Sequence, residues 1–78
     1  MRHARDDYNR IQDPANKIPI DEPVFLLRAQ DMLAPGLLAI WANELLIRGG
    51  SNDRAKEAID HAQRMIAWQE LHGCKLPD

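Results

Sequence analysis

Residues 35–50 read PGLLAIWANELLIRGG, and this stretch decides the fold class. Pro35 fits the first turn of a helix without losing a hydrogen bond, and the glycine pair at the end of the stretch stops a helix. Apolar side chains cover most of the surface between these signals, with only three polar residues among them. A helix that is apolar nearly all round has to be covered nearly all round. The stretch therefore predicts a helix over residues 35–47 that meets more than its own short chain.

The sequence after the glycine pair predicts a further helix. The stretch Ser51–Asp53 supplies N-cap candidates, and Gly73 marks the end of the helix. Lys56 and Asp60 are spaced for an i,i+4 ion pair on the exposed side. The core-facing side carries a stripe about 120° wide, formed by Ala55, Ala58, Ile59, Ala62, Met65 and Ile66. Because alanines allow two helices to approach closely, we expect the two helices to form an antiparallel hairpin.

The segment before residue 35 is ambiguous. Asp21 and Pro23 suit the start of a helix. The apolar run Val24–Leu27 that follows is too short to distinguish a helix from a buried strand by periodicity. We expect a short first helix, because an unpaired strand would leave its backbone groups unsatisfied unless another subunit supplied the partner.

The remaining residues divide the chain into three parts. Residues 1–20 are polar and interrupted by prolines, which predicts an extended N-terminal arm. Residues 21–73 form the helical domain, and residues 74–78 form a short tail. The expected architecture is all-α: a short first helix plus an antiparallel helical hairpin, with an extended polar N-terminal arm.

Composition limits the classes of function. The chain has 78 residues, 45% of them hydrophobic, and a net charge of -2. A single domain of this size has a thin margin of stability, and its lone cysteine, Cys74, cannot form an intrachain disulfide. Self-association or a bound ligand is therefore the expected source of extra stability. The slightly negative net charge argues against general nucleic-acid binding, which needs a basic surface. No apolar run reaches the length of a membrane span or of the apolar core of a signal peptide. We expect a soluble, cytoplasmic protein.

Residues that commonly carry catalysis or bind metals occur singly. His72 and Cys74 are two residues apart, but no further cysteine and no HExxH pattern completes a coordination sphere. Ser51 is the only serine and is better used as a helix cap. We therefore expect no catalytic residue, no metal ion and no cofactor.

One side of the expected helix after residue 51 combines aromatic and cationic side chains. Arg54, His61 and Trp68 recur at seven-residue intervals, beside the core-facing stripe. An indole next to an imidazole and a guanidinium suits a planar ring that carries a negative charge. The alternatives are that Trp68 covers the edge of the core or lies in an oligomer interface. A polar group, Arg28, Gln30 and Asp31, follows the run Val24–Leu27. It can form a structural network that holds the N-terminal arm, or it can form the rim of a pocket. With two of its members included, the candidate ligand-binding residues are Arg28, Gln30, Arg54, His61 and Trp68.

The apolar helix over residues 35–47 predicts self-association. Two short neighbours within one chain cannot cover all of its sides, so part of its surface is expected to meet the same helix of another subunit. The expected oligomer interface consists of Leu37, Ile40, Trp41, Leu45 and Ile47.

Several stretches together resemble a known group of proteins. Tyr8–Pro14 reads YNRIQDP, Asp21–Asp31 reads DEPVFLLRAQD, and Ile18-Pro19, Ala34-Pro35 and Trp41-Ala42 lie at matching places. This pattern resembles a group of short, uncharacterised proteins encoded by bacteriophages and prophages. No activity and no binding residue comes with the resemblance. It implies a context, since small phage accessory proteins commonly act on host systems, including defence, by occupying a host protein or sequestering a signalling nucleotide.

These observations lead to one expected function and one alternative. We expect a non-enzymatic, homo-oligomeric accessory protein of the phage type, located in the host cytoplasm. It is expected to act in counter-defence by binding a host factor. Sequestration of a small anionic or nucleotide signalling ligand is the slightly favoured form of this function. The alternative is an adaptor or inhibitor whose apolar helix over residues 35–47 docks a larger partner protein, without any small ligand.

Overall fold

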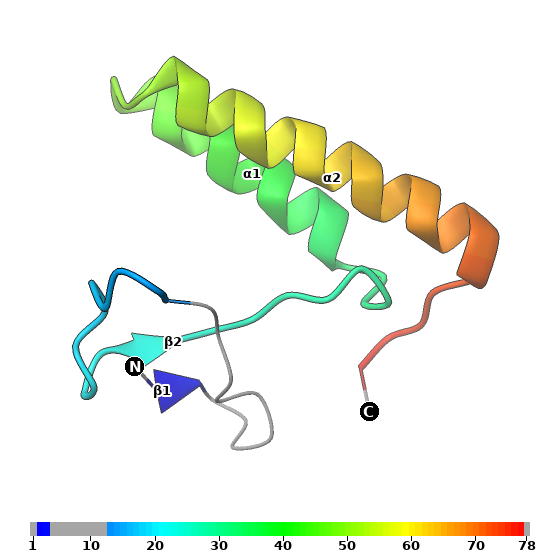
Figure 1. The fold of residues 1–78 in the computed structure, drawn as a ribbon. Coiled ribbons are helices and arrows are strands. Elements are labelled where there is room, and N and C mark those ends of the chain that lie inside the picture. Colours follow the sequence, from blue (N-terminus) through cyan, green and yellow to red (C-terminus); the bar gives the residue numbers. More distant parts are fainter. Residues whose placement is uncertain (1, 4–12, 78) are drawn as a thin grey trace.

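Two antiparallel helices dominate the protein. The computed structural model describes residues 2–3 and 13–77 (Figure 1). Helix α1 spans Ala34–Ile47 and helix α2 spans Asn52–His72. Figure 1 shows the two helices side by side along most of the length of α1. The expected helical hairpin is confirmed.

The ends of both helices follow their local sequence signals. Pro35 lies in the first turn of α1, and Ser51 Oγ accepts a hydrogen bond from the Arg54 backbone N–H at 3.2 Å, which caps α2. Gly73 ends α2 with a φ of 82°, a conformation that side chains disfavour. In the turn between the helices, a Cβ at Gly50 would overlap the side chain of Leu45. The turn therefore requires glycine at this position.

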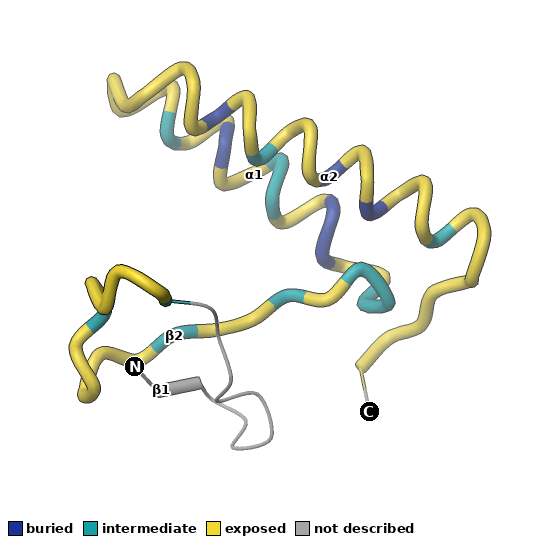
Figure 2. Tube along the Cα trace, in the orientation of Figure 1, coloured by how far each residue is buried: buried dark blue, intermediate teal, exposed yellow. Residues whose placement is uncertain are grey.

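Alanines form the contact between the helices. The buried hydrophobic residues are Ala34, Ala42, Ala55, Ala62 and Met65, and Figure 2 shows the buried positions where the two helices face each other. Ile59 and Ile66, which we expected in the core, are 36% and 46% exposed. That part of the expected stripe is wrong, because close approach through alanines leaves the larger flanking side chains outside the contact. Among the described residues, no large side chain is fully buried.

The expected short first helix does not form. Residues 22–28 are extended, and strand β2 (Pro23–Val24) pairs in parallel with strand β1 (Arg2–His3), with Arg2 opposite Pro23 and His3 opposite Val24. The expectation failed because it assumed that no strand partner was available. The chain's own N-terminus supplies one, and the two-residue β1 is too short to show as a pattern in the sequence.

The arm and the tail are described in part. Residues 1 and 4–12 of the arm lie outside the described residues. The Asp13 carboxylate accepts hydrogen bonds from the Lys17 and Ile18 backbone N–H groups, both at 3.0 Å. The continuously described part of the arm therefore begins with a turn. The tail folds back on the chain, because the Lys75 N–H donates to the Gln30 carbonyl at 3.0 Å.

Candidate functional site

The open end of the hairpin, opposite the glycine turn, is held together by one glutamine. Gln69 Nε2 donates hydrogen bonds to the carbonyl oxygens of Ala29 at 2.8 Å and Asp31 at 3.1 Å. The Asp31 carboxylate in turn accepts the Leu33 N–H at 2.8 Å, just before α1 begins. The tail adds a bond from the Met32 N–H to the Lys75 carbonyl at 2.8 Å. The segment over residues 28–32, which contains a turn closed by the Asp31 N–H and the Arg28 carbonyl at 2.9 Å, is thereby fixed against the last turns of α2.

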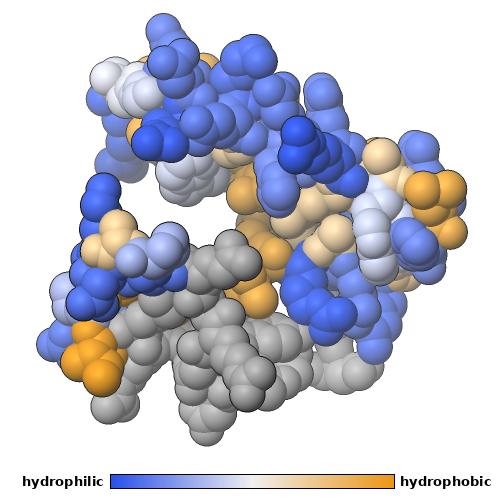
Figure 3. All heavy atoms as spheres, in the orientation of Figure 1, coloured by the Kyte–Doolittle hydropathy of each residue, from blue (hydrophilic) through white to orange (hydrophobic). Residues whose placement is uncertain are grey.

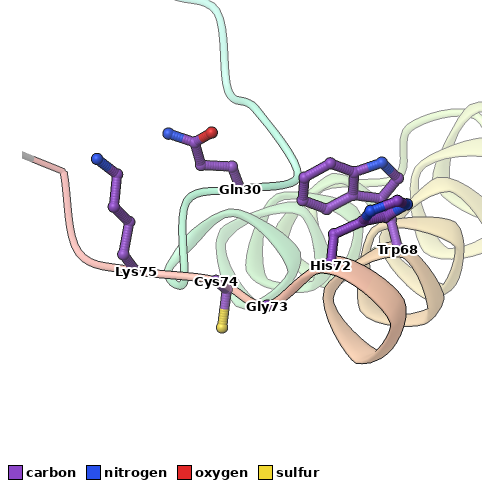
Figure 4. A pocket seen from close by; sticks show the side chains of 6 residues that line it. All are labelled: Gln30, Trp68, His72, Gly73, Cys74 and Lys75. Atoms are coloured by element: carbon purple, nitrogen blue, oxygen red, sulfur yellow. The ribbon is translucent and has the colours of Figure 1, made fainter.

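This arrangement forms a cleft, which we call the terminal cleft. Its volume is about 300 Å³, and it is lined by Gln30, Trp68, His72, Gly73, Cys74 and Lys75. The rings of Trp68 and His72 lie one turn apart on α2, with centroids 4.4 Å apart and an angle of 32° between their planes. Figure 4 shows the side chains of Gln30 and Lys75 directed to the same side as the Trp68 indole, whereas the Cys74 thiol points the other way.

Three of the five candidate ligand-binding residues gather at the terminal cleft. Gln30 and Trp68 line it, and Arg28 Nη2 donates a hydrogen bond to Gln30 Oε1 at 3.1 Å. His72 also lines the cleft, one turn after Trp68, but it falls outside the seven-residue spacing that defines the candidates on this helix. Lys75 could not be found from the sequence, because only the backbone bonds of the tail bring it to the cleft.

The other two candidates lie elsewhere along α2. At 1.5 Å per residue, His61 is about 10 Å and Arg54 about 21 Å from Trp68 along the helix axis. His61 is exposed, and Arg54 Nη1 pairs with Glu57 at 2.9 Å on the surface. Residues seven positions apart lie on the same face of a helix but two turns apart along its axis. Arg54 and His61 therefore do not converge with Trp68 within one chain.

The terminal cleft brings aromatic, amide and cationic side chains together. The Trp68–His72 ring pair offers an aromatic surface, with Trp68 itself 39% exposed. The amide of Gln30 can donate and accept hydrogen bonds, and the ammonium of Lys75 carries positive charge. Within residues 2–3 and 13–77, no group of three or more histidine, cysteine or acidic residues is placed to hold a metal ion.

The second candidate surface lies on α1, on the side away from α2. It is formed by Leu37, Ile40 and Ile47 together with Leu33, the N-cap residue of α1, and all four are exposed. We call this surface the outer stripe. Three of the expected interface residues, Leu37, Ile40 and Ile47, belong to it. Trp41 lies on the flank of α1 and is half-exposed, whereas Leu45 is half-buried and its side chain lies against the glycine turn.

Comparisons with protein-family models, curated proteins and solved structures gave no match to this chain. Neither α1 nor α2 combines the length and the apolarity that crossing a membrane requires.

Proposed function

We propose that this protein is a non-enzymatic, homo-oligomeric binding protein that holds a small anionic, nucleotide-like ligand at the terminal cleft. In the phage context that its sequence resemblance implies, it acts in counter-defence in the host cytoplasm by sequestering a signalling ligand. The observation that carries this proposal is the tilted Trp68–His72 ring pair beside Gln30 and Lys75 in one cleft. A nucleobase stacks on such rings, and its phosphate is attracted to the nearby cationic side chains.

The positions of Arg28 and Gln30 support a defined ligand orientation. The guanidinium of Arg28 holds the Gln30 amide through the oxygen, which leaves the amide N–H₂ group to donate to a ligand acceptor. Arg54 takes no part in this proposal within a single chain, because it lies about 21 Å from Trp68 along α2. His61 is closer but does not line the terminal cleft.

Tryptophan fluorescence tests the proposal. The chain has two tryptophans, so Trp41→Phe leaves Trp68 as the only indole. We expect ATP and cyclic AMP to change its emission in a saturable way, with a weaker response to adenosine and to inorganic phosphate alone. Ligand at about a hundredfold excess over its dissociation constant should stabilise the fold by about 2.7 kcal/mol, a shift in Tm of about 10 °C or more.

Two variants sharpen this test. Gln30→Ala should remove the response, whereas Arg54→Ala should leave it unchanged, because Arg54 lies far along α2. The proposal is contradicted if the change in Trp68 emission is equal in both variants, or if neither ATP nor cyclic AMP changes the emission.

A second candidate function rests on the outer stripe. An adaptor or inhibitor docks a larger partner on an exposed apolar helix face, and the outer stripe of α1 is such a face. A protein that stays monomeric and fails to respond to the nucleotide panel would favour this function over the first.

A further inference from the structure

The outer stripe is largely uncovered within one protomer. Ile40 and Ile47 are 66% and 68% exposed, and the contact between α1 and α2 buries mainly alanines. Figure 3 shows a hollow between the hairpin and the segment around β2, with apolar side chains at its border.

The spacing of the outer stripe is symmetric about its middle residue. Leu33 precedes Ile40 by seven residues, and Ile47 follows it by seven. When two copies of such a helix cross antiparallel at Ile40, Leu33 of each copy meets Ile47 of the other. A two-fold interface requires a self-complementary surface of this kind.

The charges on α1 decide between the two directions of pairing. Glu44 is the only ionisable residue between Met32 and Ile47. Glu44 lies on the same helix face as Ile40 and pairs with Arg48 Nε at 2.8 Å. In a parallel pair, the Glu44 of each copy would lie beside the Glu44 of the other, and the two like charges would repel each other. In the antiparallel pair centred on Ile40, Glu44 lies opposite Gly36, where a Cβ would meet nothing within 4 Å in the protomer.

We infer that a second copy of this chain covers the outer stripe, with its α1 packed antiparallel on α1 of the first copy and Ile40 at the two-fold axis. The inference rests on the oligomeric part of the proposed function and names its partner and its surface. It does not depend on the ligand, since the terminal cleft lies at the end of α2 and outside the stripe.

Matched substitutions on α1 test the position of the interface. Light scattering during size exclusion should give the wild type a mass of about twice the 8.9 kDa of one chain at tens of micromolar. Ile40→Glu should raise the dissociation constant about a hundredfold or more, because it buries two carboxylates at the axis. Leu46→Glu is the control: Leu46 is also exposed on α1 but lies off the stripe. Equal dissociation in both variants would overturn the inference.

Cross-linking tests the direction of pairing without relying on a destabilised variant. In a Cys74→Ser background, chains with Leu33→Cys are mixed with chains with Ile47→Cys and oxidised with copper phenanthroline. We expect disulfide-linked dimers in the mixture and few in either chain alone, because only the antiparallel pair brings these positions together. Efficient cross-linking of the Leu33→Cys chain by itself, or none in the mixture, would overturn the inference.

The two proposals fail separately. A wild-type protein that elutes as an 8.9 kDa monomer while Trp68 still responds to nucleotides would remove the dimer and keep the ligand. A dimer with no nucleotide response would do the reverse.

Discussion

Gln69 connects the fold of this protein to its terminal cleft, so Gln69→Met is the most informative single substitution at that end. Methionine keeps the length of the side chain but has no N–H to donate. The variant therefore loses the two hydrogen bonds to the carbonyl oxygens of Ala29 and Asp31, which are 2.8 and 3.1 Å long and partly buried. At about 0.5–1.5 kcal/mol for each bond, the free energy of unfolding should fall by about 1–3 kcal/mol.

Thermal unfolding measures this loss directly. For a domain of this size, a loss of about 1–3 kcal/mol lowers Tm by about 4 °C at the least and about 24 °C at the most. Gln63→Met is the matched control, since Gln63 is an exposed glutamine on the same helix, and it should leave Tm nearly unchanged. The nucleotide response of Trp68 should weaken in the Gln69 variant alone, because Gln30 loses its support. Equal melting of the two variants would refute the argument that Gln69 holds the open end.

Three further predictions concern the helices and are checked by urea or thermal unfolding. Ala62→Leu should cost about 1–3 kcal/mol, because Ala62 is buried between the helices and leucine overfills the contact; an unchanged midpoint would contradict close packing there. Gly50→Ala should be destabilising, since its Cβ overlaps Leu45. Gly36→Ala meets open space within one protomer, so it should be neutral or gain up to about 1 kcal/mol when unfolding is measured at a concentration at which the protein is monomeric. The reverse order would refute the turn geometry. Ser51→Ala should cost about 1 kcal/mol through loss of the α2 cap, and stability within error of the wild type would show that the cap contributes nothing.

The helices could be predicted from the sequence because their signals are local. Pro35, the glycine pair, Ser51 and Gly73 each act on backbone groups within one turn, and the structure confirms all of these boundaries. Which side of α2 faces α1 is not a local property. The contact follows Ala55, Ala62 and Met65, so the isoleucines that share the apolar arc remain partly exposed.

The two main differences from the sequence analysis both come from pairing between distant segments. Strand β2 forms because residues at the far N-terminus pair with it, and a two-residue strand leaves no periodic pattern. The terminal cleft forms because the tail bonds to Gln30 and Met32. Trp68 could be recognised as a candidate from its type and its face on the helix, but Lys75 could not, because its position depends on these backbone bonds.

The central structural proposal is that a second copy of the chain covers α1. Sedimentation equilibrium of the unmodified protein, from low to high micromolar concentration, measures this most directly. The account predicts a reversible dimer of about twice the 8.9 kDa chain mass. A folded protein that melts cooperatively and sediments as a single chain throughout that range would contradict it.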